Sequence, residues 1–438
     1  MKNEEIKKVA FITLGCKVNQ YETNAMTQKF IESGYKVVEH HEKADIYVIN
    51  TCTVTNMSDR KSRQMLRKVK ELNNDAVVVA CGCYAQVARE ELEKIEEIDL
   101  ILGNNEKNDI VEYIEKYIQE EKKQVEIADV MQQKEFVDFG NVTYTEKTRA
   151  VIKVQDGCDR FCSYCIIPYA RGRVRSRKPE SILSEIEKIA KEGMKEVVIT
   201  GIHIASYGKD FKENYELIDL LEEINQLQGI ERIRLGSIEP LLITEKFMKR
   251  LVKLEKVCHH FHLSLQSGCD ETLKRMNRRY TTEQFKEIVK LLRKYYEDVV
   301  LTTDIIVGFP QETEEEFQKT YDFLKKIKFY KMHVFKYSPR KGTKAAQMTG
   351  QIDGNKKEER SQCLIELSNQ NEEEYNKKYI GKKVEVLFEE EKDGIYKGHT
   401  KNYILACCKK EKINEIAENK IITVRCIEAG KDHIMVEM

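Results

Sequence analysis

Residues 157–165 have the sequence GCDRFCSYC, which places three cysteines at Cys-x3-Cys-x2-Cys spacing. The residues just before them, 151–155, are predicted to form a strand, so the cysteines lie in the loop that leaves it. Three thiolates this close in sequence can hold one face of a cubane iron–sulfur cluster and leave its fourth iron open for chemistry. The alternatives are a structural zinc site and buried thiols, but zinc normally takes a fourth protein ligand, and none follows at the usual spacing. The loop therefore favours a cluster held by Cys158, Cys162 and Cys165.

Strands and helices alternate around this loop, over residues 148–352. The predicted strands are 151–155, 196–201, 232–236, 261–265, 300–307 and 332–337. Six strands separated by helical segments indicate a (β/α)6 partial barrel rather than a closed eightfold barrel.

A second alternation occupies residues 1–120, with predicted strands at 8–14, 44–50, 76–80 and 98–102. Predicted helices follow at 20–33, 58–72, 86–95 and 106–118. This order is typical of a parallel α/β sheet. Residues 121–147 are polar and poorly periodic, so we expect a linker there.

The end of the chain changes character. Residues 353–380 are charge-rich and predict a connecting helix, which Gly381 would end. Residues 381–438 contain five short β runs, at 383–388, 396–399, 404–408, 421–427 and 434–436. A small antiparallel β-barrel fits them, because closure removes exposed strand edges.

Three further cysteines, Cys16, Cys52 and Cys83, each follow a predicted strand of the N-terminal sheet. The carboxyl ends of parallel strands share one edge, which is where ligands bind in open α/β sheets. Cys81, two residues before Cys83, is an alternative member of this set. The remaining cysteines have no ligand-like spacing and are expected to be buried thiols. They are Cys258, Cys269, Cys363, Cys407, Cys408 and Cys426.

Polar residues also end the central strands. Alternation in residues 261–266 puts His262, Ser264 and Gln266 on one side, whereas a barrel without a ligand would be filled with branched apolar residues. Buried polar groups need a partner, and a cofactor is one. Other residues at or near the ends of predicted strands are weaker candidates for contacts with a cofactor. They are Thr200, Gly201, Ser237, Glu239 and Asp304.

The composition limits where the protein acts and how it can bind a nucleic acid. Lys plus Arg and Asp plus Glu both number 74, so a nucleic acid would have to be held by local basic patches. One patch contains four alternating arginines, Arg171, Arg173, Arg175 and Arg177, close to the cysteine loop. No segment is apolar enough for a signal peptide or a membrane span. We therefore expect a cytoplasmic protein with no membrane partner. Thirteen cysteines in that reducing compartment point away from a disulfide framework and toward metal ligation or catalysis.

The Cys-x3-Cys-x2-Cys loop after the first strand of a (β/α)6 chain resembles the radical S-adenosylmethionine (SAM) superfamily. The settings of Cys16, Cys52 and Cys83, the segment 155–173 and the C-terminal barrel resemble one of its families, the radical methylthiotransferases, over nearly the whole chain. The resemblance implies a [4Fe-4S] cluster on Cys158, Cys162 and Cys165 that cleaves SAM to a 5′-deoxyadenosyl radical. It implies a second [4Fe-4S] cluster on Cys16, Cys52 and Cys83, with Cys83 chosen over Cys81 by its position in the GCYAQ element.

The same resemblance implies further roles. Tyr164 corresponds to an aromatic residue beside the adenine of SAM, and the C-terminal barrel corresponds to an RNA-binding TRAM domain. The substrate would be a base of the tRNA anticodon loop, with the four arginines holding phosphates, an external electron donor, and a sulfur donor that the sequence does not identify. A loop base recognised by stacking would have to be splayed out of the helix.

Residues 14–23, LGCKVNQYET, resemble the branch that converts N6-threonylcarbamoyladenosine at tRNA position 37 to its 2-methylthio derivative. The alternatives are isopentenyladenosine in tRNA and an aspartate of a ribosomal protein. A cluster carrier that only transfers electrons and an RNA-binding protein with structural zinc are rivals of other classes.

Overall fold

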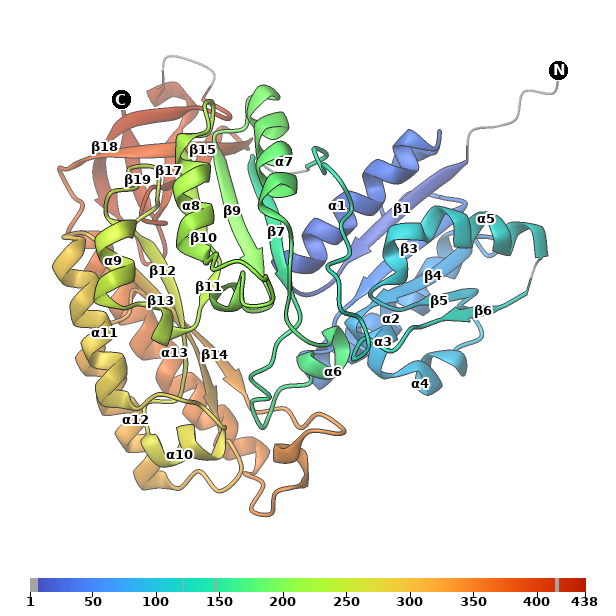
Figure 1. Ribbon diagram of the computed structural model, residues 1–438. Helices are drawn as coiled ribbons and strands as arrows, with labels where there is room; N and C mark the ends of the chain where they lie inside the picture. Colours follow the sequence, from blue (N-terminus) through green and yellow to red (C-terminus); the bar gives the residue numbers. More distant parts are fainter. Residues whose placement is uncertain (1–6, 121, 146–147, 414–416) are drawn as a thin grey trace.

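The computed structural model describes residues 7–120, 122–145, 148–413 and 417–438. Residues 1–6 of the expected N-terminal domain, 121 and 146–147 of the expected linker, and 414–416 of the expected C-terminal barrel lie outside the described residues. Figure 1 shows three units: an N-terminal sheet, a central barrel and a small C-terminal barrel. The fold class predicted from the sequence is confirmed.

The N-terminal unit is a six-stranded parallel sheet of order β2-β1-β3-β4-β5-β6. Its strands are β1 (Lys8–Thr13), β2 (Lys36–Val38), β3 (Ile46–Thr51), β4 (Val77–Gly82), β5 (Leu100–Leu102) and β6 (Gln124–Glu126). Its helices are α1 (Lys17–Glu32), α2 (Asn56–Leu72), α3 (Cys83–Val87), α4 (Arg89–Glu93) and α5 (Ile110–Glu120), the last preceded by η1 (Glu106–Asp109). Apolar strand residues such as Val48 and Ile49 are buried on both faces, as a parallel sheet between helices requires.

Two edge strands of this sheet were missed by the sequence analysis. Both β2 and β6 have three residues, which is too short for alternation to show. Strand β6 pairs with β5, so the expectation that all of 121–147 is linker is wrong: Gln124–Glu126 belongs to the first sheet.

The central unit carries the six expected strands, with β7 (Arg149–Asp156), β9 (Glu196–Gly201), β10 (Arg232–Leu235), β12 (His260–Gln266), β13 (Val300–Val307) and β14 (Lys331–Lys336). Two short strands, β8 (Arg175–Ser176) and β11 (Ser237–Ile238), add to them. The hydrogen-bonded sheets are β10-β9-β7-β8 and β11-β12-β13-β14, joined by a parallel bridge between Ile233 and Val257. The result is an open (β/α)6 partial barrel.

Helices and short turns cover the outside of the barrel. The helices are α6 (Ile167–Arg171), α7 (Pro179–Lys191), α8 (Leu217–Gln226), α9 (Glu245–Leu251), α10 (Asp270–Arg275), α11 (Thr282–Tyr295) and α12 (Glu314–Ile327). The 3-10 turns are η2 (Ile204–Ser206), η3 (Pro240–Leu242) and η4 (Lys344–Gln347). Thr281 and Thr313 cap α11 and α12 with a capping box, which satisfies the first backbone N–H groups of each helix.

Helix α13 (Gly354–Lys377) leads to a closed barrel of order β15-β16-β17-β19-β18. Its elements are β15 (Lys383–Lys392), β16 (Ile395–Thr400), β17 (Leu405–Lys409), η5 (Lys410–Lys412), β18 (Ile421–Ala429) and β19 (Ile434–Glu437). The expectation of a purely antiparallel barrel is corrected in one place, because β17 and β19 pair in parallel. A closed ring with an odd number of strands must contain such a pair.

The N-terminal unit and the C-terminal barrel pack against different parts of the central barrel. Helix α1 contacts β7 and β9, and α3 contacts α6, so the N-terminal unit lies along the open side of the partial barrel. The C-terminal barrel lies at the other end from α6 (Figure 1), where Arg232 at the start of β10 donates to the carbonyls of His399 and Glu385, both at 3.0 Å. Within the described part of the chain, no helix is both long and apolar enough to cross a membrane.

Candidate cluster and cofactor sites

Cys16, Cys52 and Cys83 come from the loops after β1, β3 and β4, which are neighbours in the sheet. A Cβ added to Gly15 would lie 2.7 Å from the Sγ of Cys52, and Gly15 has φ +103°, so only glycine lets the first loop approach the second. The Asn19 amide donates to the carbonyls of Leu14 (2.7 Å) and Thr51 (3.0 Å) and ties these loops together. The sheet therefore brings the three cysteines to one edge.

The second cysteine loop is wrapped by its own backbone. The N–H of Cys158 donates to Gly172 at 3.0 Å and that of Cys165 to Cys162 at 2.9 Å. A Cβ on Gly157 would lie 1.7 Å from the carbonyl oxygen of Arg173, which explains the glycine before the first cysteine. Phe161 adopts φ +47°, an uncommon conformation for a bulky residue that is held by the turn.

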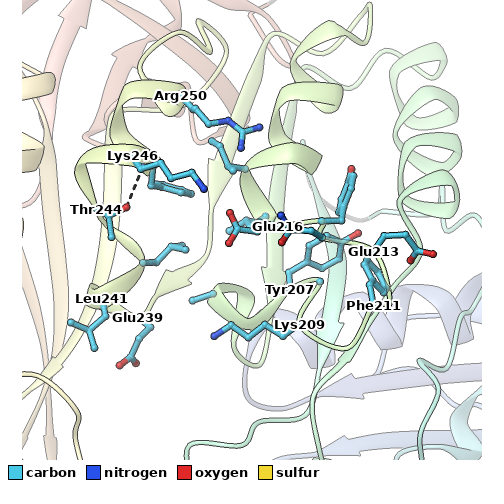
Figure 2. Close-up of a pocket in the computed structure, with 18 of the residues that line it drawn as sticks. Tyr207, Lys209, Phe211, Glu213, Glu216, Glu239, Leu241, Thr244, Lys246 and Arg250 are labelled. Atoms are coloured by element: carbon cyan, nitrogen blue, oxygen red, sulfur yellow. Dashed lines mark hydrogen bonds between the residues drawn. The ribbon is translucent and has the colours of Figure 1, made fainter.

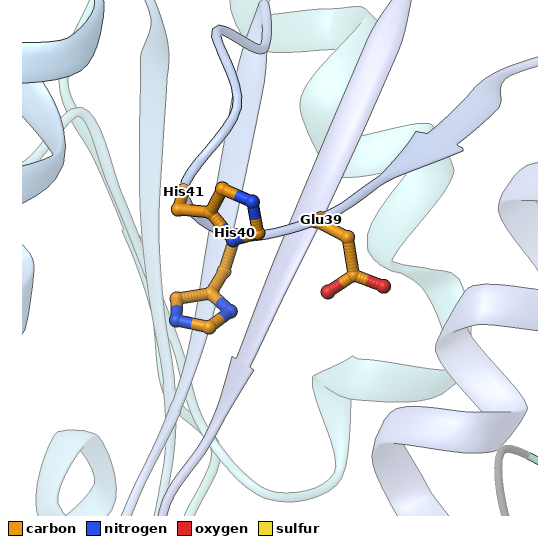
Figure 3. Close-up of side chains that lie close together, drawn as sticks. All are labelled: Glu39, His40 and His41. Atoms are coloured by element: carbon orange, nitrogen blue, oxygen red, sulfur yellow. The ribbon is translucent and has the colours of Figure 1, made fainter. Parts of the chain in front are cut away.

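The distances between the cysteine sulfurs distinguish a cluster site from a site for a single metal ion. Tetrahedral zinc with bonds of about 2.3 Å would hold its sulfurs about 3.8 Å apart. Among the described residues, the only group of three candidate ligands within 4.8 Å of one another is Glu39, His40 and His41 (Figure 3). These three are consecutive and exposed, whereas both cysteine sets are more widely spaced. The arrangement fits a larger group than one ion.

Burial opposes ionisation of these thiols. It raises the pKa of Cys52 and Cys158 to about 11 and that of Cys165 to about 12. Ligation requires thiolates, so the site needs compensating positive charge or hydrogen bonds. Two buried arginines supply both: Arg171 Nε donates to the Sγ of Cys83 at 3.2 Å, and Arg278 donates to the Sγ of Cys162 at 3.3 Å.

Arg171 extends from the central barrel into the N-terminal unit. Its guanidinium bonds Asn19 (2.7 Å) and Glu22 (3.0 Å) there, and Asp156 (3.3 Å) on its own side. Lys107 and Lys153 also pair with Glu22, and Lys153 and Arg175 pair with Asp156. Four cations thus face two carboxylates, and the surplus positive charge lies beside Cys83.

This network overturns part of the RNA-binding expectation. The side chains of Arg171, Arg175 and Arg177 are 0%, 1% and 0% exposed, so they cannot hold phosphates of a bound RNA. Arg177 instead pairs with the buried Glu185 at 2.9 Å and with Asp138 at 3.1 Å. Arg173 differs: its side chain is 54% exposed, lies over the ring of Phe161, and pairs with Asp159 at 3.3 Å.

Several of the predicted cofactor contacts meet around Arg278. The guanidinium donates to Glu239 at 2.9 Å and to the carbonyl of Ser264 at 2.9 Å, in addition to Cys162. His203 lies 3.6 Å from the same Glu239 carboxylate. The sequence analysis gave neither Arg278 nor His203 a role at the site, because the cysteine loop and these residues meet only in the fold.

His262 and Asp304 form a separate pair inside the barrel. His262 Nε2 lies 3.2 Å from Asp304 and its Nδ1 lies 3.0 Å from the hydroxyl of Thr302. His333 lies on β14, two strands away from β12, and its ring centroid is 5.7 Å from that of His262. The polar barrel interior predicted from alternation is therefore present.

The other predicted contacts are more scattered. Tyr164 packs against Met276, Phe309 and Tyr337, and burial raises its pKa well above the usual value. Thr200 is buried and Ser237 is exposed. A Cβ on Gly201 would lie 2.9 Å from the carbonyl oxygen of Gln155, and Gln266 adopts φ +72° where β12 breaks register. These residues lie at strand ends but are not joined to the Arg278 group by side-chain hydrogen bonds within the described chain.

Two cavities adjoin the second cysteine loop. The larger, of about 560 Å³, lies between η2, α8 and α9 and is lined in part by Lys209, Lys246 and Arg250 (Figure 2). The smaller, of about 210 Å³, is lined by Asp159 and Arg279. Both are lined by Arg160 and Lys209, so they are neighbours.

Cys81 and Cys83 lie in different surroundings. Cys81 is fully buried in β4, among apolar residues that include Val79 and Leu100, and its thiol donates to the carbonyl of Ile49 at 3.7 Å. Cys83 begins α3 at the sheet edge and accepts the bond from Arg171.

We therefore expect Cys83→Ala to lose about half of the bound iron, because one of two ligand sets is broken. The Cys81→Ala variant, two residues away, is the matched control and should keep its iron. Iron and sulfide analysis after anaerobic reconstitution measures both variants. Normal iron in Cys83→Ala with loss in Cys81→Ala would reverse the assignment.

Comparison with known proteins first defines the class. Residues 152–324 match the family model described as Radical SAM superfamily, and residues 8–103 match that described as Uncharacterized protein family UPF0004. The fold resembles the radical S-adenosylmethionine methyltransferase TsrM of Kitasatospora setae, with a TM-score of 0.55, 16% identity, and coverage of 75% of this chain and 73% of that one.

Two curated relatives then define the family. The threonylcarbamoyladenosine tRNA methylthiotransferase MtaB of Bacillus subtilis is 42% identical over 96% of this chain and 94% of its own. The tRNA-2-methylthio-N(6)-dimethylallyladenosine synthase of Caldicellulosiruptor saccharolyticus is 35% identical over 97% of this chain and 88% of its own. The chain belongs to the radical SAM tRNA methylthiotransferase family.

Proposed function

We propose that this protein attaches a methylthio group to C2 of N6-threonylcarbamoyladenosine at position 37 of tRNA. The observation that carries the proposal is Arg171, which belongs to the central barrel and bonds Cys83 of the other cysteine set. This contact supports an arrangement in which the two cysteine sets lie near one interdomain interface, as a reaction that needs both would require. An electron carrier or a zinc protein has no need of that arrangement.

The residues present fit two iron–sulfur clusters. Cys158, Cys162 and Cys165 would hold one and Cys16, Cys52 and Cys83 the other, with Arg278 and Arg171 as hydrogen-bond donors to a sulfur of each set. When bound, the clusters and S-adenosylmethionine supply the radical chemistry and the methylthio group. Glu239 orients Arg278, and Tyr164 offers an apolar surface for the adenine of SAM. The remaining predicted contacts, His262, Asp304, Ser264, Gln266, Thr200, Gly201 and Ser237, stay proposals.

The higher identity to the threonylcarbamoyladenosine enzyme favours that base over the dimethylallyl one. An aspartate of a ribosomal protein remains the alternative from another substrate class. The partners would be tRNA, an external reductant and a sulfur donor, in the cytoplasm.

The test is anaerobic reconstitution, followed by mass spectrometry of tRNA nucleosides after incubation with SAM and a strong reductant. Formation of 2-methylthio-N6-threonylcarbamoyladenosine is expected. Deoxyadenosine without this nucleoside would retain the radical chemistry and exclude the proposed substrate.

For the RNA contact we retain Arg173 and add the cations of the two neighbouring cavities. Lys209 is exposed and forms no ion pair with any other described residue, and it lines both cavities beside the cysteine loop. Exposed cations such as Arg173 and Lys209, next to a reactive centre, can hold the phosphates that position a loop base.

The double variant Arg173→Ala/Lys209→Ala is expected to bind tRNA about 10-fold more weakly at 0.15 M salt, because each lost phosphate contact removes released counterions. The slope of log affinity against log salt should fall by about 1 to 2. Lys290→Ala, on α11 and paired with Glu287, is the control and should leave both quantities unchanged. Unaltered affinity and slope in the double variant would exclude this surface.

A further inference from the structure

Lys17 lies where all three units of the protein meet. It is the first residue of α1, directly after Cys16. Its ammonium is close enough to interact electrostatically with Arg149 of β7, Glu196 of β9, Arg234 of β10 and Tyr403 of the C-terminal barrel. Burial lowers the pKa of His260 on β12 and of His333 on β14, and the charge of Lys17 adds to this lowering in both. Lys17 therefore belongs to a group of charged side chains that several strands of the partial barrel and the C-terminal barrel contribute.

The side chain of Lys17 has no partner there. It forms no hydrogen bond or ion pair with any other described residue, and it is solvent-accessible although charged groups from several strands surround it. The ammonium group is therefore free to bind an anion from outside the chain, next to the set formed by Cys16, Cys52 and Cys83.

The base of the barrel has a surplus of positive charge. Arg234 forms an ion pair with Glu196 at 2.6 Å, and Arg149 forms one with Glu389 at 3.0 Å. Both nearby carboxylates are therefore already paired. Arg232 also lies at this end of β10, and its guanidinium donates to two backbone carbonyls. Lys17 adds a further charge that none of the described carboxylates neutralises.

The surroundings of Tyr403 show the effect of this positive charge. Its ring is stacked between His260 and His399, with centroids at 4.5 and 4.6 Å, and its backbone is held at φ +75°. Burial by itself raises the pKa of the Tyr403 hydroxyl, but Arg149, Lys17 and Arg234 lower it below its usual value. A bulky residue in a left-handed conformation is costly and is kept where the site requires it.

We propose that Lys17 binds the carboxylate of the threonylcarbamoyl arm of the substrate base, with Arg149 and Arg234 adding positive charge nearby. The inference rests on the proposed function and deepens it, since Lys17 becomes the residue that selects an anionic modified adenosine.

The chemistry of the base agrees with this position. The methylthio group joins C2 of adenine, whereas the arm starts from N6 on C6, and C2 and C6 lie on either side of N1. With C2 turned toward Cys16, Cys52 and Cys83, the arm leaves the ring to one side of these cysteines, where Lys17 directly follows Cys16. A dimethylallyl arm carries no charge and would leave Lys17 without a partner, which is the basis of discrimination.

The experiment measures affinity with full-length protein and three anticodon stem-loops, which differ only at position 37. They carry threonylcarbamoyladenosine, its neutral carboxamide analogue, or isopentenyladenosine. The wild type should bind the carboxylate form roughly 10- to 100-fold more tightly than the carboxamide, as expected for a charge-assisted hydrogen bond. Lys17→Met should reduce this ratio to about 1 to 3, and Lys17→Arg should restore part of it. Lys36→Met, an exposed lysine of β2 in the same sheet, should keep the full ratio.

Two outcomes separate this inference from the proposed function. A wild type that makes the methylthio product but binds carboxylate and carboxamide equally overturns the role of Lys17, whatever the variants do. A wild type that prefers the carboxylate but forms no methylthio product supports the binding site and refutes the reaction. An undiminished ratio in a folded Lys17→Met also overturns the inference.

Discussion

Replacing Cys158 by alanine is expected to reduce 5′-deoxyadenosine formation by at least about 1,000-fold, to the level without enzyme. The loop offers three thiols, and its backbone bonds fix Cys158 and Cys165 on either side of Cys162. Two remaining thiols would not hold a cluster whose reactive iron must stay open. The loss should appear in kcat and in the iron content together, as measured by chromatography of the nucleoside product and by iron analysis.

Cys363→Ala is the matched control for this experiment. Cys363 is also partly buried, but it lies on α13 without another cysteine in its surroundings. It should retain both iron and deoxyadenosine formation. Deoxyadenosine production by Cys158→Ala at the wild-type rate would disprove the ligand assignment and with it the proposed reaction.

Elements with strong periodicity could be predicted from the sequence. The central strands were placed to within two residues at most of their ends, because apolar runs such as 300–307 are long and are bounded by polar turns. Strands β2 and β6 could not be predicted, since three residues at a sheet edge show no pattern. The parallel pair β17–β19 follows from closing five strands, which no local sequence reveals.

The cysteine loops were predictable for a different reason. Each cysteine lies within a few residues of the end of a predicted strand, and parallel strands bring their carboxyl ends to one edge of the sheet. What holds the loops together was not predictable: Asn19 and Arg171 act through partners far away in sequence.

The arginine run 171–177 shows why charge alone misleads. Its alternation resembles a solvated basic patch, and only the fold brings the buried carboxylates Glu22, Asp156 and Glu185 to it. A signal was present in the sequence, since Asn19 and Glu22 follow shortly after Cys16, around the start of the predicted helix. Three residues separate Asn19 from Glu22, so on a helix that begins after Cys16 the two side chains share one face.

Glu22→Gln is expected to destabilise the protein by about 3 to 5 kcal/mol at pH 7, which is the usual cost of breaking a buried ion pair from one side. Glu22 is 1% exposed and accepts bonds from Arg171, Lys107 and Lys153, so its loss leaves these cations facing Asp156 alone. The network joins two units, so the iron content on the Cys16, Cys52 and Cys83 set should also fall. Glu96→Gln, at an exposed position of the same unit, should change neither quantity.

The pH dependence of this difference identifies its cause. Although burial alone raises the pKa of Glu22, Arg171, Lys107 and Lys153 together hold it well below the usual value of 4.5. A carboxyl whose pKa is depressed in the folded protein stabilises it above the unfolded pKa, and that contribution is lost as the pH falls toward the folded value. The gap in unfolding free energy between wild type and Glu22→Gln should therefore be constant from about pH 6 to 8 and shrink below about pH 4.5. Denaturant unfolding at several pH values measures it, and a gap that does not change with pH would attribute the effect to packing rather than to charge.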